Sequence, residues 1–138
     1  MSRSGYSDDI YDQQHFAMYR GRVTSATRGK RGQAFLKALA DAMDAMPEKA
    51  LIANELQDKS GAVCAIGALG AARGVDMSVL DPADSVSVAA TFDIAEVLAR
   101  ETVYMNDEGT WNGAESPSAR WDRMRGWVGS QIKATTAV

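Results

Sequence analysis

The 138-residue sequence contains one cysteine, one histidine and three prolines. A single cysteine, Cys64, excludes an internal disulfide, and with His15 as the only histidine no cysteine–histidine zinc set can form. No apolar run reaches the roughly 18–20 residues that a membrane-spanning helix needs. Residues 1–19 carry three aspartates and lack the apolar core of a secretory signal peptide. These absences favour a cytoplasmic protein that does not enter a membrane.

The composition is that of an ordinary globular protein, with 46% hydrophobic and 24% charged residues. The length suits one domain that is large enough to bury a core. We therefore expect a single globular domain over residues 1–138, with residues 1–7 and 134–138 frayed.

The net charge of −3 is unevenly distributed along the chain. Between Asp12 and Asp41 there are six bases and no acid, whereas residues 41–115 hold fourteen acids and four bases. From residue 116 onward the balance is +3. Such blocks predict a surface with a basic and an acidic region, which would steer a charged partner.

The least polar stretch, Lys59–Gly74, predicts a buried central helix over about 62–73. A helix that is apolar on all sides is normally buried on all sides. Gly67 and Gly70 each cost about 1 kcal/mol of helix propensity relative to alanine, so we expect the backbone of another segment to approach closely there. Arg73 and Gly74 are signals that end a helix.

Apolar periodicity and capping signals predict the remaining helices. Helix starts are indicated by Asp81-Pro82, by a capping box of Asp93 with Glu96, and by Ser116-Pro117. The expected ranges are about 8–26, 32–46, 81–90, 93–105 and 117–133. The sequence thus predicts a mainly α protein, a compact bundle of five or six helices around the buried central helix.

The apolar stripes of two of these helices bear on the candidate sites. The first helix is expected to bury Phe16, Tyr19, Val23 and Ala26. The last helix is expected to bury Trp121, Met124, Val128 and Ile132, with Trp127 at the edge of the stripe.

Residues 50–64 fit two structures. Ala50–Leu56 and Ala62–Cys64 can form a short β-hairpin around the turn Asp58–Gly61, and this is the favoured prediction. The competing prediction is a helix through residues 50–57, because short apolar runs do not separate the two.

Cys64 and His15 are the side chains that a nucleophilic enzyme would use, but they are expected on different helices. A cysteine nucleophile needs a nearby base and a stabilised thiolate. Cys64 lies instead at the start of an apolar run, which favours a buried structural thiol. A small enzyme is the weaker alternative, and it would need several of Cys64, His15, Glu101, Asp107 and Glu108 to meet in one cleft.

Asn106–Glu115 is expected to form a polar loop after a helix. Its Asn106-Asp107-Glu108 run suggests a metal site, but the alternating acids of an EF-hand loop are absent. Glu101 is expected in a structural ion pair with an arginine, since no second carboxylate is placed for acid–base catalysis. The sequence predicts neither a metal nor a cofactor.

The run Arg28-Gly29-Lys30-Arg31-Gly32 has two interpretations. Glycines free backbone N–H groups and the side chains add charge, so the run can grip phosphate. The alternative is a solvated basic turn between helices. The nucleic-acid hypothesis uses the whole basic segment 20–37, which also contains Arg20, Arg22 and Lys37.

Tryptophans and arginines are interleaved near the end of the chain. Trp111, Trp121 and Trp127 occur beside Arg120, Arg123 and Arg125. This pattern suits stacking on nucleic-acid bases or contact with the acidic rim of a protein partner. The alternative is that Trp121 packs in the core while the arginines are solvated.

Four segments together, RGKRGQAFL (28–36), VCAIGALG (63–70), MNDEG (105–109) and RWDRMRGWV (120–128), resemble a set of small uncharacterised proteins encoded by bacteriophages and prophages. The likeness spans most of the chain from Tyr19 to Ile132. It implies a phage accessory protein in a bacterial cytoplasm, and proteins of this size and setting often bind and block a host protein.

We therefore expect a non-enzymatic phage accessory protein that acts through protein–protein interaction, with inhibition of a host defence system (anti-CRISPR-like or other anti-defence) as the specific hypothesis. The partner would be a host or phage protein, and the acidic middle segment would occupy a nucleic-acid channel on it. A nucleic-acid-binding regulatory protein is the alternative, and a homodimer is left open. The candidate binding residues are Arg20, Arg22, Arg28, Lys30, Arg31, Trp111, Arg120, Arg123, Arg125 and Trp127.

Overall fold

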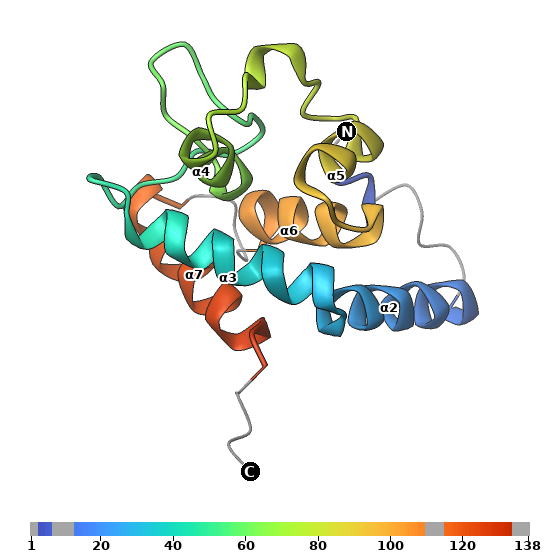
Figure 1. Ribbon diagram of the computed structural model, residues 1–138. Coiled ribbons are helices and arrows are strands. Elements are labelled where there is room, and N and C mark those ends of the chain that lie inside the picture. Colours follow the sequence, from blue (N-terminus) through green and yellow to red (C-terminus); the bar gives the residue numbers. More distant parts are fainter. Residues whose placement is uncertain (1–2, 7–12, 110–114, 134–138) are drawn as a thin grey trace.

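The computed structural model of the chain describes residues 3–6, 13–109 and 115–133. This part of the chain is helical and contains no strand, so the mainly α prediction is confirmed (Figure 1). None of its helices has the length and apolar character needed to cross a membrane. The helices are α2 (Gln13–Arg28), α3 (Lys30–Asp44), α4 (Ala65–Ala72), α5 (Ser85–Phe92), α6 (Glu96–Glu108) and α7 (Pro117–Gln131), with the 3-10 helix η1 (Met77–Val79) between α4 and α5.

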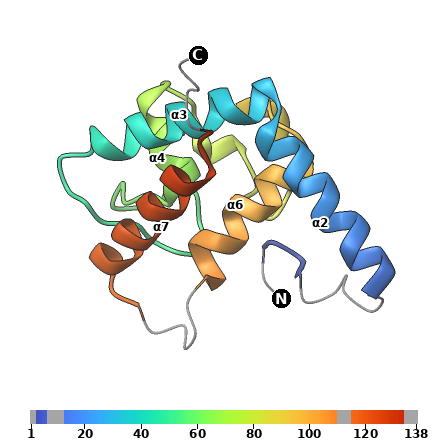
Figure 2. The ribbon, with the colours of Figure 1, turned by 90° about the horizontal axis from the view of Figure 1, so that it is seen from below.

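Helix α6 lies in the middle of the bundle and contacts α2, α4, α5 and α7. Helix α3 packs against α4 and α7 and meets α2 at a bend, and α2 then extends outward past α6 (Figures 1 and 2). One apolar core joins these helices. Its fully buried side chains include Phe35, Leu36, Leu39, Met43, Leu51, Ile66, Phe92, Leu98, Met124 and Val128.

Helix α4 is buried over Ala65–Gly70, as its apolar sequence predicts. A side chain at Gly67 would collide with the carbonyl of Leu56, and one at Gly70 would meet Met77 and Phe92. The expected close approach of another backbone is therefore confirmed at Gly67, whereas the neighbours of Gly70 are side chains. The helix ends before Gly74, whose φ of 71° suits glycine.

Helix α4 begins at Ala65, three residues later than expected. Cys64 is its N-cap, with extended backbone angles, and the thiol accepts a hydrogen bond from the N–H of Gly67 at 3.3 Å. Cys64 therefore is the last residue of the extended segment, and the helix starts directly after it.

The predicted hairpin is reduced to one antiparallel bridge between Gln57 and Val63. The turn at Asp58–Gly61 forms as expected, and Ile52, Leu56 and Asp58 keep backbone hydrogen bonds to the second arm, but other backbone groups of the first arm bind elsewhere. The N–H of Leu51 donates to the carbonyl of Pro117 at 3.0 Å, and the carbonyl of Ile52 accepts from the side chain of Asn106 at 2.9 Å. Neither a hairpin of two strands nor a helix over 50–57 is present.

Two predicted helix starts are wrong. Helix α5 begins after Asp84, which accepts from the N–H of Ser87 at 3.2 Å, whereas Asp81 stabilises only a turn before it. Asp93 does not cap α6, because it adopts a left-handed conformation (φ 55°) that ends α5. Ser116 caps α7 and Pro117 is its first residue, as predicted.

The predicted polar loop also starts too early. Asn106, Asp107 and Glu108 form the last turn of α6 rather than a loop. Asn106 is 1% exposed, so a polar residue that suggested a loop belongs to the interior. The remaining residues of that predicted loop, except Gly109 and Glu115, lie outside the described residues.

Candidate functional site

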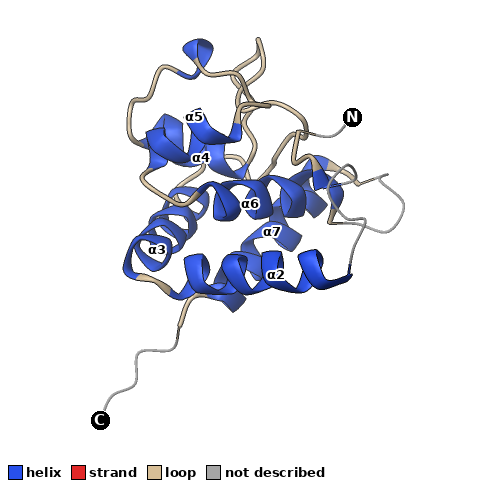
Figure 3. Cartoon of the chain, turned by 90° about the vertical axis from the view of Figure 1, so that its right-hand side faces the viewer, coloured by secondary structure: helices blue, strands red, loops and turns tan. Residues whose placement is uncertain are grey.

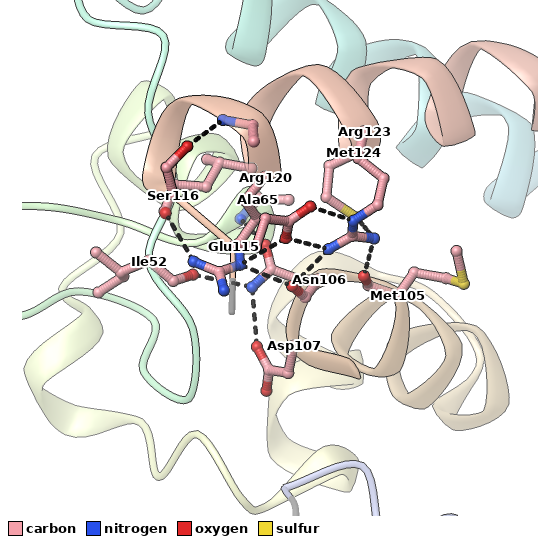
Figure 4. A network of polar contacts seen from close by, with 12 residues as sticks. Ile52, Ala65, Met105, Asn106, Asp107, Glu115, Ser116, Arg120, Arg123 and Met124 are labelled. Atoms are coloured by element: carbon pink, nitrogen blue, oxygen red, sulfur yellow. Dashed lines mark hydrogen bonds and ion pairs between the residues drawn. The ribbon is translucent and has the colours of Figure 1, made fainter. Parts of the chain in front are cut away.

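Arg120 and Arg123 of α7 point toward Asn106 and Glu115 (Figure 4). Arg120 is 8% exposed and donates to the carbonyl oxygens of Asn106 and Leu51, at 3.1 and 3.3 Å. Arg123 donates to both carboxylate oxygens of Glu115, at 2.7 and 2.9 Å. The expectation of solvated arginines is therefore wrong, because these guanidinium groups join α7 to α6 and to the loop before α4.

Arg125 and the tryptophans also lie against the protein. Arg125 makes two hydrogen bonds to Asp44 at the end of α3, at 2.8 and 3.0 Å. Trp121 and Trp127 are half-buried against the core, and Trp111 lies outside the described residues. A binding role for this set stays a prediction, and its described arginines already have partners inside the fold.

Asn106 is where this polar network converges (Figure 4). Its Oδ1 accepts from the N–H of Ala65 at 3.1 Å, and its Nδ2 donates to the carbonyl of Ile52. Its own carbonyl oxygen accepts from Arg120 and Arg123, both at 3.1 Å. One buried residue thus ties α6 to α4, to α7 and to the loop that leads into α4.

The carboxylates around Asn106 act as counter-ions. Hydrogen bonds from Arg123, together with the charge of Arg120, hold the pKa of Glu115 below its usual range. Asp107, whose side chain is 3% exposed, accepts hydrogen bonds from Arg3 at 2.5 and 2.8 Å. Within the described ranges, no group of three histidine, cysteine, aspartate or glutamate side chains is placed to hold a metal ion.

Residues 3–6 form a strap that lies between α6 and α2 (Figure 2). Arg3 binds Asp107, and the ring of Tyr6 stacks on Tyr104 with 4.8 Å between the ring centroids. Tyr6 is 8% exposed. The predicted fraying of the N-terminal residues does not apply to this strap, because it supplies the cation for a buried carboxylate.

Glu101 forms the structural ion pair that the sequence predicts. Its carboxylate accepts two hydrogen bonds from Arg20, at 2.6 and 2.9 Å, and one from the hydroxyl of Tyr6 at 2.7 Å. Burial and the hydrogen bonds to Tyr19 and Glu101 raise the pKa of Tyr6. Glu101 therefore joins α2 and the strap to α6 and occupies Arg20, one of the predicted binding residues.

Of the side chains that the enzyme hypothesis needs, Cys64 and Asp107 both lie against Arg3, where the guanidinium occupies them. Cys64 is buried, as expected, and its thiol interacts with the side chain of Arg3. Burial lowers the pKa of Arg3, but the interactions with Cys64 and Asp107 raise it above its ordinary value. His15 is exposed on α2. Glu101 and Asp107 are bound by arginines. These groups serve the fold, and they do not converge around His15.

A groove lies along the projecting half of α2, with a volume of about 400 Å³. Phe16 and Met18 on its wall are 41% and 63% exposed. The predicted burial of Phe16 is wrong, because α2 extends past the helices that would cover it (Figure 2). We call this feature the α2 groove; its other lining residues are Tyr6, Tyr19, Val97, His15, Arg22, Arg100 and the acid Glu96.

The basic residues of segment 20–37 are divided between several surfaces. Arg22 lines the α2 groove. Arg28 and Lys30 flank the bend between α2 and α3 and are exposed. Arg31 lies beside Asp93 at 3.3 Å, and both side chains are exposed. Arg20, also part of segment 20–37, is bound to the buried carboxylate of Glu101.

Two surface features stand out once the internal contacts are assigned, the α2 groove and the basic bend between α2 and α3. The first combines apolar and cationic side chains, and the second is cationic. The chain matches no protein-family model, no curated protein and no solved structure with which it was compared.

Proposed function

We propose that the protein is a non-enzymatic binding protein that takes a segment of another protein into the α2 groove. The observation that carries this proposal is the exposure of Phe16 and Met18 on the wall of a cavity. Aromatic residues, methionine and arginine are enriched in the cores of protein interfaces. A cavity with exposed apolar side chains, two arginines (Arg22 and Arg100) and one glutamate (Glu96) suits a partner segment with an apolar anchor and acidic neighbours.

The groove is built on a firm base. Tyr6 and Tyr19 on its wall lie edge to face with 5.5 Å between the ring centroids, and the guanidinium of Arg100 lies 5.5 and 5.6 Å from these rings. Their hydroxyl groups are 3.0 Å apart. A partner would therefore meet a surface that loses little conformational entropy on binding, which favours affinity.

The resemblance to phage-encoded proteins supports a more specific proposal, in which the partner is a host defence enzyme and binding inhibits it. The acidic middle segment supports the same idea. Exposed acids occur on the loops before α4 and α5, at the end of the molecule away from the α2–α3 bend (Figure 3): Glu55, Asp76, Asp81 and Asp84. Such a surface would compete with nucleic acid for a basic channel.

The test is affinity capture from host lysate with three forms of the protein. The wild type and the control Val79→Glu, which alters an exposed apolar side chain on η1, should retain the same partner. The double variant Phe16→Glu, Met18→Glu should lose it, because charged groups would enter the groove. Equal capture by all three forms would reject the groove, and turnover of a small-molecule substrate by the purified protein would reject a purely binding role.

A further inference from the structure

The bend between α2 and α3 is fixed by close packing at Gly32 and by hydrogen bonds of Gln33. A side chain at Gly32 would collide with the carbonyl of Ala26 in α2. The Nε2 of Gln33 donates to the carbonyls of Thr27 and Gln131, at 2.7 and 3.0 Å, and its Oε1 accepts from the N–H of Lys133 at 2.8 Å. Gln33 thereby fixes the end of α7 beside the bend. We call this structure, residues 27–33 with Lys133, the basic elbow.

The cations of the basic elbow are not needed for these contacts. Arg28, Lys30 and Lys133 are exposed, and no ion pair involving their side chains is present in the described part of the chain. Arg31 pairs with Asp93, but an exposed pair at 3.3 Å contributes little to stability. This contrasts with Arg120 and Arg123, whose guanidinium groups hold helices together.

Two hollows flank the elbow. The first has a volume of about 310 Å³ and is lined by Arg20, Arg28 and Lys133, with Glu101 as its acid. The second has a volume of about 320 Å³ and is lined by Lys30, Arg31 and Arg73, with Asp93 as its acid. Each hollow therefore holds three cations and one carboxylate, and in each case an arginine is already bonded to that carboxylate.

The electrostatic surroundings favour an anion at this place. Helix α3 starts at the elbow with Gly29 as its N-cap and no side-chain cap, so the positive end of its dipole adds to the charge. The acidic loops before α4 and α5 lie at the other end of the molecule (Figure 3). The acids that do line the hollows, Glu101 and Asp93, are each paired with an arginine, so the cations exceed the acids at the elbow despite the net charge of −3.

We propose that the basic elbow binds the phosphate backbone of a nucleic acid, with one hollow on each side of the bend taking a phosphate. The exposed large hydrophobic side chains of the described chain are Phe16, Met18, Val79 and Val86, and none belongs to the elbow. A protein interface would have an apolar centre. Contacts through charge alone are typical of backbone binding, which positions the ligand but does not read its sequence.

Binding at the basic elbow is independent of the α2 groove and can be measured separately. A fluorescein-labelled 30-base-pair DNA duplex of arbitrary sequence is titrated with the full chain at about 50 mM salt, with anisotropy as the readout. We expect binding whose affinity falls with salt, with a slope of about −2 to −4 in log–log form for two to four neutralised phosphates. A second duplex of unrelated sequence should bind equally.

The variant Arg28→Ala, Lys30→Ala, Lys133→Ala should lose at least tenfold in affinity. Its matched control, Lys37→Ala, Lys49→Ala, Lys59→Ala, removes the same charge from exposed sites outside both hollows and should bind nearly as the wild type does. Circular dichroism shows whether both variants are folded. No binding by the wild type, or an equal loss in both variants, would overturn the proposal. Competition by poly-L-glutamate as effective as that by unlabelled duplex would overturn it too, since the elbow would then be a surface for acidic protein.

Discussion

Gly67 and Gly126 both lie inside helices, but their surroundings are opposite. A β-carbon at Gly67 would collide with the backbone of Leu56, whereas one at Gly126 would meet nothing within 4 Å. Gly67→Ala should therefore destabilise the protein by about 2–3 kcal/mol or more, because backbone must move. Gly126→Ala should stabilise it by about 0.5–1 kcal/mol, because alanine is the better helix former. Urea denaturation of both variants tests this, and equal effects would contradict the close packing of α4.

Glu115 provides a residue-scale link between stability and pH. Its pKa in the folded protein lies below its ordinary value of 4.5, because Arg123 donates hydrogen bonds to it. Its stabilising contribution is therefore complete above about pH 4.5 and is lost as the pH falls through the lower folded-state pKa. The free energy of unfolding, measured from pH 7 to pH 3, should fall over this acid range.

The variant Glu115→Gln isolates this contribution. It leaves Arg120 and Arg123 without their carboxylate, so it should cost about 2–4 kcal/mol at pH 7. The variant should also show a shallower loss of stability below pH 4.5 than the wild type. An acid profile parallel to that of the wild type would mean that the carboxylate does not titrate with folding.

At the scale of elements, the strap tests how much four N-terminal residues contribute to the bundle. The side chains of Arg3 and Asp107 are 4% and 3% exposed. Arg3→Met leaves a buried carboxylate without its cation and should cost about 3–5 kcal/mol in the free energy of unfolding. Asp107→Asn in the Arg3→Met background should recover part of that loss, and Arg22→Met, at an exposed position, should cost little. A double variant as unstable as the sum of the single variants would contradict a direct pair.

The helices themselves were largely predictable, and their boundaries were less so. The buried run of α4 and the Ser116-Pro117 start of α7 are local signals that tertiary structure did not change. Asp81 and Asp84 are equally good caps by type, and the choice fell on Asp84 because it places Val88 and Phe92 in the core. A choice of this kind depends on contacts that are distant in sequence.

The polar network was not predictable from the sequence by the same means. Asparagine is typical of loops, yet Asn106 is buried in α6, because its side chain forms hydrogen bonds with the N–H of Ala65 and the carbonyl of Ile52. Arg3 sits in a polar N-terminal stretch that carries no periodic signal. Nothing in the residues that flank Arg120 distinguishes it from an arginine on the surface of a helix. In each case the partner lies far away along the chain, so only the folded structure identifies it.

At the scale of the whole molecule, the charge blocks of the sequence become two ends of one surface. The acidic loops before α4 and α5 lie opposite the basic elbow (Figure 3). The α2 groove is a separate feature on the projecting half of α2. A protein segment in the groove and a nucleic acid at the elbow would therefore occupy different surfaces. An enzyme bound to its nucleic-acid substrate would offer a ligand for each of these two surfaces.

The bundle, the strap and α2 should unfold as one unit. Side chains from α3 to α7 share one apolar core, and the strap and α2 are bonded to α6 through Asp107 and Glu101. We therefore expect one cooperative unfolding transition. Far-UV circular dichroism, which reports all helices, and tryptophan fluorescence, which reports Trp121 and Trp127 in α7 together with Trp111, should give the same urea midpoint. In the Gly67→Ala variant both midpoints should shift together. An earlier loss of helical signal at constant fluorescence would show that α2 unfolds separately, since it is joined to the bundle mainly through α6 and the bend to α3.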